Sequence, residues 1–229
     1  MRSKTIVVVT FMFVIGILFA SLAFAGPTGG STTTGAQDRG VNSSVTTLTT
    51  EGGNVTEVNV TGTQITTKWA GFYGQVSGSL QITDASSNVF YSWSVANVSG
   101  SVVYATNGTV NDWSNANINA MNYSNAPTHI GNVSATDNFT NTFNFSGTFS
   151  SASITQATAY TETYVSGSQT HDFKTYALVS SSDKVAIWAA VARDDDTSFQ
   201  GGLNTVDYQL LAGTLDGTNT QFSFYLELP

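Results

Sequence analysis

Cysteine is absent from this 229-residue chain, and charged residues make up only 10% of it, against roughly 25% in an average globular domain. Without cysteine, the chain can form no disulfide framework, thiolate nucleophile or cysteine–zinc site. Seven Lys and Arg against fifteen Asp and Glu give a net charge of −8, which excludes the basic stripe of a nucleic-acid binder. Asn, Ser and Thr replace the missing charge and make up about a third of the sequence.

The N-terminal segment has the pattern of an export signal. Arg2 and Lys4 precede an apolar stretch over residues 5–25, which ends in Ala23-Phe24-Ala25. A positive start, an apolar run and small residues before the cleavage point are typical of a secretory signal peptide. We therefore predict a signal peptide over 1–25 and a secreted or cell-surface protein. The alternative is a retained membrane anchor, because the stretch is long enough to span a bilayer.

The remaining chain is predicted to be all-β. Residues 26–44 lack hydrophobic periodicity and are rich in Gly, Ser and Thr, which indicates a flexible leader. Residues 45–229 form one predicted domain, a β-sandwich of immunoglobulin-like or jelly-roll-like type, because short apolar–polar alternations recur along them. Residues 185–192 are all apolar, which predicts a central strand covered on both faces. Residues 112–121 read as a short helix or an irregular loop.

Five further runs alternate with period two and predict strands with one buried face. Their apolar sets are Val76, Leu80 and Ile82; Val89, Tyr91, Trp93 and Val95; Phe143, Phe145 and Phe149; Val206, Tyr208 and Leu210; and Phe222, Phe224, Leu226 and Leu228. The residues between them, Asp207, Gln209 and Glu227 included, are predicted to face solvent.

N-glycosylation sequons are the strongest chemical signal in the sequence. Nine Asn-x-Ser/Thr triplets begin at Asn42, Asn54, Asn59, Asn97, Asn107, Asn122, Asn132, Asn138 and Asn144. A glycan must face water. The alternation places Asn59, Asn138 and Asn144 on the solvent side of their predicted strands.

Several segments together resemble a known group of proteins. They are Trp69-Ala-Gly-Phe-Tyr-Gly-Gln-Val-Ser-Gly78, Val89-Phe-Tyr-Ser-Trp93, Val102-Val-Tyr-Ala105, Asp112-Trp113-Ser114, Thr205-Val-Asp-Tyr-Gln209 and Phe222-Ser-Phe-Tyr-Leu-Glu-Leu228. In this order they resemble uncharacterised secreted archaeal β-rich cell-surface proteins. The resemblance implies a surface location and a shared β-rich fold, and it offers no catalytic residue.

No catalytic motif is evident in the sequence. The two histidines, His129 and His171, lack the spacing of a zinc site, and no Gly-x-Ser-x-Gly elbow is present. The acidic run Asp194, Asp195 and Asp196 is a candidate calcium site, because hard cations prefer carboxylate oxygens. Its alternative is a solvated loop, partly balanced by Arg193.

Tyr225 is the candidate for stacking on a sugar, because it falls on the polar side of the last predicted strand. Tyr73 and Tyr104 are weaker candidates for the same role.

These observations favour a non-enzymatic secreted or cell-surface glycoprotein with a structural or adhesive role. Its expected partners are other surface proteins, polysaccharide or further copies of itself, with no cofactor unless calcium binds. The leader and residues 45–67 are rich in Thr and Val, and one route to self-association is their addition as a strand to a neighbour's sheet. The same segment has the alternative of pairing within its own domain. A carbohydrate-binding module is the second functional hypothesis, and a secreted hydrolase is the third.

Overall fold

The computed structural model describes residues 26–35, 37–131, 134–202, 204–215 and 219–229 of the protein. The predicted signal peptide and the sequon at Asn132 lie outside these residues. Strands dominate the described chain, and its two helices have four residues each. The predicted all-β, sandwich-like class is confirmed. No described helix has the length and apolarity needed to cross a membrane.

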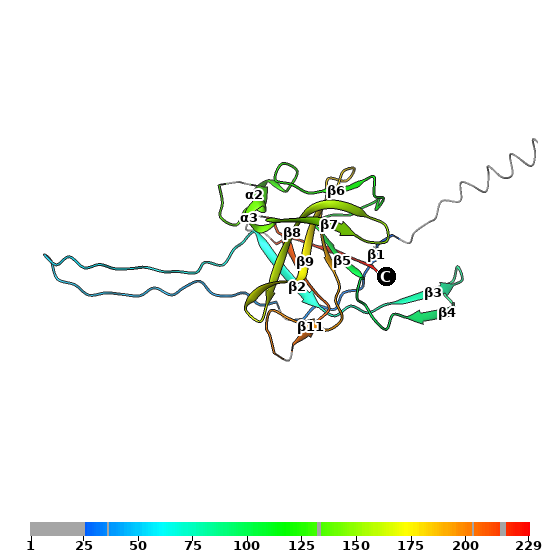
Figure 1. Cartoon of the computed structure of the whole chain (residues 1–229), viewed down its shortest axis with the longest axis horizontal. Coiled ribbons are helices and arrows are strands. Elements are labelled where there is room, and N and C mark those ends of the chain that lie inside the picture. The colour runs from blue at the N-terminus through cyan, green and yellow to red at the C-terminus, as the bar shows by residue number, and fades with distance from the viewer. Residues whose placement is uncertain (1–25, 36, 132–133, 203, 216–218) are drawn as a thin grey trace, which may run out of the picture.

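The main sheet has eight strands and is antiparallel (Figure 1). Its spatial order is β1 (Thr28–Gly29), β14 (Ser223–Glu227), β5 (Val102–Thr106), β10 (Ala186–Val191), β9 (Ser168–Ser180), β8 (Thr155–Val165) and β7 (Phe145–Ser150). The eighth strand, β6 (Ile118–Ala120), pairs with β9 beside this path. The first and last strands of the described chain, β1 and β14, therefore meet at one edge of the sheet.

Strand β10 lies inside the sheet and is buried on both faces. It pairs with β5 on one side and β9 on the other. Trp188 and Ala190 pack into one hydrophobic cluster, while Ile187 and Ala189 pack into a second cluster on the opposite face. The central, doubly covered strand predicted over 185–192 is thus confirmed.

The first face of the main sheet is covered by a second layer. Strands β13 (Tyr208–Gly213) and β2 (Trp69–Gly74) pair with each other and pack on it. Helices α2 (Thr128–Gly131) and α3 (Phe139–Thr142) add Ile130 and Phe139 to the same cluster. The Trp69 ring meets the Trp188 ring edge-on, with 5.6 Å between centroids. Trp188, the largest side chain of β10, is therefore fully buried between the two layers.

The second face is covered by an irregular segment rather than by a sheet or helix. Val110, Trp113 and Ile118 from this segment pack with Phe149 and Ile154. The helix considered for 112–121 is not formed, and the loop alternative is correct. The Asp112 carboxylate accepts the Ser114 N–H at 2.8 Å, which makes a local turn. The segment ends in β6, and the backbone of β6 is hydrogen-bonded to β9.

The longest strands, β8 and β9, were not among the predicted runs. They form a hairpin that turns at Ser166 and Gly167, both with positive φ. Threonine occupies both faces of β8, so its apolar–polar alternation is weak in the sequence. Thr158 is nevertheless buried, and its hydroxyl donates to the Ala177 carbonyl at 2.5 Å.

Two segments project from opposite ends of this body (Figure 1). One is the hairpin of β3 (Ser79–Thr83) and β4 (Val89–Ser94). The other, named the arm, is residues 37–68, which leave the body and return in two extended segments. A small pair, β11 (Asp196–Thr197) and β12 (Thr205–Val206), lies near the body's lower end.

The predicted boundary between residues 44 and 45 falls within the outgoing segment of the arm, so the arm contains both the end of the predicted leader and the start of the predicted domain (Figure 1). The start of the predicted leader is itself part of the body, because β1 pairs with β14 in the main sheet.

Candidate assembly surfaces and glycosylation sites

The arm is extended and exposes its apolar side chains. Val45 is 91% exposed and Val60 is 85% exposed. Its described part over 37–66 makes two backbone-to-backbone hydrogen bonds, one of which joins the Ser43 N–H to the Thr63 carbonyl at 3.0 Å. Most of its backbone donors and acceptors therefore face water. Such groups are the ones that a strand of another chain can pair with.

Side chains take the place of a ladder where the two segments of the arm run closest. The Ser43 hydroxyl accepts the Thr63 N–H at 2.6 Å, and the Asn42 amide oxygen accepts the Ile65 N–H at 2.8 Å. The turn at the far end of the arm uses Gly53, whose φ of +92° suits glycine. The arm is thus closed at its base and loosely paired beyond it.

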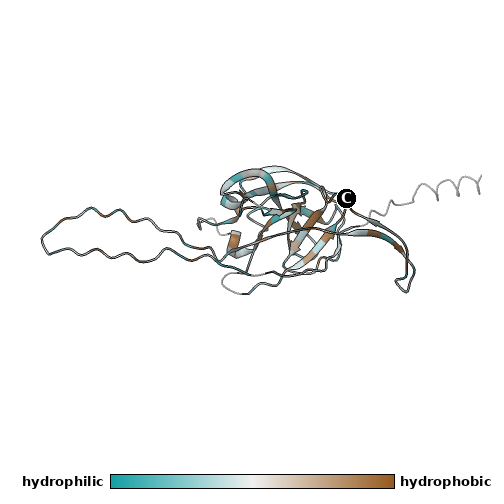
Figure 2. Ribbon diagram, turned by 90° about the horizontal axis from the view of Figure 1, so that it is seen from below, coloured by the Kyte–Doolittle hydropathy of each residue, from teal (hydrophilic) through white to brown (hydrophobic). Residues whose placement is uncertain are grey.

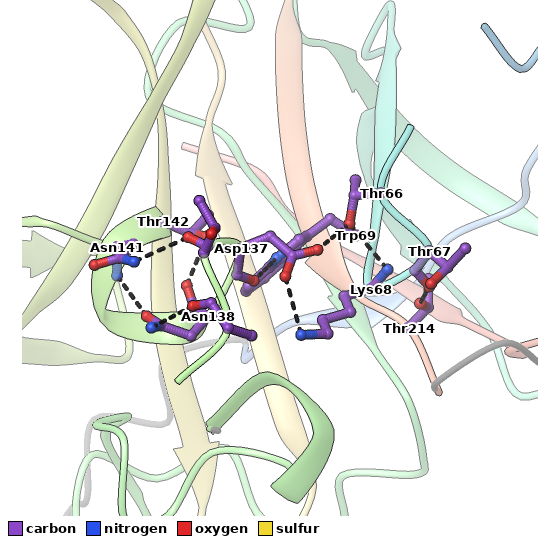
Figure 3. Close-up of polar contacts among 11 residues, drawn as sticks. Thr66, Thr67, Lys68, Trp69, Asp137, Asn138, Asn141, Thr142 and Thr214 are labelled. Carbon is purple, nitrogen blue, oxygen red and sulfur yellow. Dashed lines mark hydrogen bonds and ion pairs between the residues drawn. The ribbon is translucent and has the colours of Figure 1, made fainter. Parts of the chain in front are cut away.

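The returning segment of the arm is anchored to the body through Asp137 (Figure 3). The Asp137 carboxylate accepts the Thr66 hydroxyl at 2.7 Å and pairs with the Lys68 ammonium at 2.9 Å. Its backbone carbonyl accepts the Trp69 indole N–H at 2.8 Å. The Thr66 hydrogen bond, followed by Lys68, holds the pKa of Asp137 below its ordinary value. The root of the arm is therefore fixed where β2 begins.

The other root of the arm follows β1, whose partner β14 is held by a buried carboxylate. Glu227 was predicted to face solvent, and this is wrong, because it is only 4% exposed. The Tyr104 hydroxyl donates to Glu227 at 2.5 Å, and the Ser153 N–H donates to it at 3.1 Å. Burial, and then the hydrogen bond to Glu227, raise the pKa of the Tyr104 phenol.

Tyr225 is not the exposed stacking platform that its sequence position suggested. Its ring packs against Trp113, with 5.0 Å between centroids, and joins the hydrophobic cluster on the second face. Tyr104 is fully buried in the same cluster. Both residues lie on the side of the sheet that the irregular segment covers, so the polar neighbours of Tyr225 do not indicate water. The prediction that Tyr225 offers an exposed ring to a sugar is therefore wrong.

The aspartate run does not form the predicted calcium site. Asp195 has a positive φ and accepts the Gln75 amide at 3.1 Å, while Asp196 pairs with Arg193. Asp195 and Asp196 thus have different partners, and Asp194 is exposed. Within the described ranges, no three His, Asp or Glu side chains are grouped so as to hold a metal ion.

Two other acidic or amide residues predicted to face solvent are buried. The Asp207 carboxylate accepts the Val76 N–H at 2.6 Å, and the Gln209 side chain donates to the Tyr164 carbonyl at 3.0 Å. Asp207 thus holds the chain that follows β2, and Gln209 links β13 to strand β8. The alternation of β13 did not indicate these contacts.

The structure separates the predicted sequons by exposure. Six are exposed in the described chain: Asn42, Asn54, Asn59, Asn97, Asn122 and Asn144. Asn107 is partly buried, and its amide oxygen accepts the Ala186 N–H at 3.2 Å. Asn138 is only 3% exposed, so its predicted solvent-facing position is wrong.

Asn138 is buried because it caps helix α3 instead of lying in a strand. Its amide oxygen accepts the Asn141 N–H at 2.8 Å, and its amide nitrogen donates to the Ala135 carbonyl at 2.7 Å (Figure 3). An N-linked glycan would replace a hydrogen on that nitrogen and needs open space beside it, which a residue that is 3% exposed does not offer. Asn138 directly before the apolar Phe139 was the available signal for this cap, because Asn is a favoured N-cap residue.

The sequence also predicted buried faces that the structure leaves open. Leu80, Ile82, Tyr91 and Trp93 share one face of the β3–β4 hairpin and are about half exposed, between 48% and 55%. Figure 2 shows this projecting hairpin as partly hydrophobic. The alternation correctly placed these side chains on one face, but no described layer covers that face.

The histidine side chains lie outside the described part of the structure, so the hydrolase hypothesis stays a prediction. Scans against protein-family models and searches of curated proteins and of solved structures found no match to this chain.

Proposed function

We propose that the protein is a non-enzymatic, secreted or cell-surface structural glycoprotein that assembles with copies of itself through its arm. The observation that carries this proposal is the arm, an extended projection with exposed valines and a largely unpaired backbone. Strand addition uses both features, because main-chain hydrogen bonds supply affinity and alternate side chains supply specificity. The anchored roots at Asp137 and β1 give the arm a defined direction from the body.

Glycosylation is compatible with this assembly. Asn59 lies between Val58 and Val60, and successive side chains of an extended chain point to opposite faces. A glycan on Asn59 would therefore leave the valine face free. At Asn42 the amide oxygen accepts the Ile65 N–H, and a glycan on the amide nitrogen leaves that oxygen in place. The proposal includes the surface location that the resemblance to secreted archaeal surface proteins implies.

The proposal is tested by shortening the arm without disturbing its roots. Residues 45–61 are replaced by two glycines, which leaves the hydrogen-bonded pair Ser43 and Thr63 to close the loop. Negative-stain microscopy and light scattering then compare this variant with the chain starting at Gly26. We expect the longer chain to form multimers and the shortened chain to stay monomeric. A monomeric parent, or equal assembly by both chains, would contradict the proposal.

Polysaccharide binding is the second candidate, and exposed ring pairs favour it. Tyr91 and Trp93 lie 4.7 Å apart between centroids, and Tyr73 and Phe199 lie 5.0 Å apart. Exposed aromatic rings stack on apolar faces of ligands. A glycan array with the parent and a Trp93→Ala variant tests this candidate. Binding that requires Trp93 supports it, and the absence of binding by the parent rejects it.

A further inference from the structure

The β3–β4 hairpin has an apolar face without a partner. Its cross-strand pairs Leu80–Trp93 and Ile82–Tyr91 place four large side chains together, and the Tyr91 and Trp93 rings touch. Every residue of both strands is exposed. A two-stranded hairpin on its own is marginally stable in water, and a contiguous exposed apolar patch marks an interaction site.

The outer edges of this hairpin are also open. Within the described residues, β3 and β4 pair only with each other. The pairing of its strands continues to the base of the hairpin, where the Val95 N–H donates to the Gly78 carbonyl at 3.2 Å. A Cβ on Gly78 would come within 2.8 Å of Leu228, so the chain passes close to the body there. The hairpin is thus a two-stranded sheet whose base lies close to the body and whose outer edges have no neighbouring strand in the described chain.

The arm has the features of a strand that could pair with the hairpin, namely exposed valines and a largely unpaired backbone. Both are poor in charge: the arm's far half carries Glu51 and Glu57, and the hairpin carries Asp84 in its turn. Residues 55–61 of the returning segment are also long enough to lie along one strand of the hairpin, because β3 has five residues and β4 has six.

The two segments cannot meet within one molecule in the arrangement seen. Figures 1 and 2 both show the arm and the hairpin pointing away from opposite ends of the body. A contact between them therefore joins different copies. Because the two surfaces differ, the contact is head-to-tail, and such contacts build open filaments when the rotation between copies does not close a ring.

We infer that the β3–β4 hairpin of one copy receives the arm of the next. The returning segment of the arm, residues 55–61, pairs along an outer edge of the hairpin and lays Val58 and Val60 beside its apolar face. This inference rests on the proposed self-association and names its acceptor. The glycan-bearing side of Asn59 then faces away from the contact.

Cysteine cross-linking tests this contact cleanly, because the natural chain has no cysteine. Val60→Cys protein is mixed with Leu80→Cys protein under mild oxidation, and the disulfide-linked heterodimer is measured by mass. Two matched acceptors serve as comparisons: Tyr123→Cys, an exposed site away from the hairpin, and Thr148→Cys, an exposed site on the open edge strand β7. We expect the Leu80 heterodimer to exceed both by at least about tenfold, as a specific contact requires.

The outcomes separate the inference from the proposal beneath it. A yield at Leu80 equal to that at Tyr123, or a higher yield at Thr148, overturns the inference even if multimers form. If no multimers form and no heterodimer exceeds the Tyr123 level, both the inference and the proposed function fail. A Leu80→Ser/Trp93→Ser variant gives an independent check. It should lose assembly while its unfolding midpoint stays unchanged, because both residues lie outside the core clusters.

Discussion

Replacing Tyr104 with phenylalanine should destabilise the edge of the sheet that holds the first root of the arm. The change removes the hydroxyl that donates to Glu227 at 2.5 Å. It keeps the ring, whose contact with Trp113 has 5.0 Å between centroids. A hydrogen bond to a charged group contributes about 1.5–3 kcal/mol. We therefore expect the free energy of unfolding to fall by about 2 kcal/mol and Tm to fall by roughly 4–8 °C.

A double-mutant cycle isolates this interaction from other effects of the change. Chemical denaturation is measured for the parent, Tyr104→Phe, Glu227→Gln and the double variant. Residues that share a buried hydrogen bond couple by about 0.5–3 kcal/mol, so the two changes should not add. Tyr123→Phe is the matched control, since this tyrosine is 62% exposed and its change should stay within about 0.5 kcal/mol. Additive single changes, or a Tyr104→Phe effect as small as the control, would refute the reasoning.

The same residue gives the pH dependence a definite sign. Because folding raises the pKa of Tyr104, the folded state keeps the phenol proton at a pH where the unfolded chain has lost it. The unfolded tyrosine titrates near pH 10, so the stability that comes from this group is present below that pH and is lost as pH rises above it. We expect the parent to lose stability more steeply than Tyr104→Phe above about pH 10.

Three further predictions address the core, a sequon and the arm root. Gly213→Ala should cost about 1–3 kcal/mol in denaturant unfolding, because its Cβ would lie 2.8 Å from a core isoleucine, whereas Gly71→Ala, which has open space, should cost less. Glycopeptide mass spectrometry should find Asn138 bare and the exposed Asn54 modified; a glycan on Asn138 would contradict the buried cap. Folding lowers the pKa of Asp137, so its anchoring of the arm should be present above the ordinary carboxyl pKa and should weaken as pH falls through the folded-state pKa. Protease cleavage of the arm, measured against pH, should follow this change. Asp137→Asn should remove the pH dependence of cleavage.

Alternation predicted which side chains share a face, and this was correct in β14 and in the β3–β4 hairpin but wrong at Asn138, which caps a helix. Phe222, directly before β14, and Phe224 and Leu226 within it pack against the first cluster, as expected. The apolar pairs of the β3–β4 hairpin also share a face. What alternation lacks is the identity of the neighbour on that face. The long hairpin β8–β9 escaped prediction for a related reason, because threonine is accepted on both buried and exposed faces.

The sequence by itself determined the all-β class and the central place of β10, because an apolar pattern on both sides of a strand is stable only when both sides are covered. Only the tertiary structure decided which of the remaining faces meet water. The polar side of β14, with Glu227, is buried because residues 107–118 fold over it, and Tyr104 and Ser153 satisfy the carboxylate. The apolar side of the β3–β4 hairpin is open because no part of the described chain reaches it. Whether a face is buried depends on both layers that meet there, and the alternation of one strand describes only its own layer.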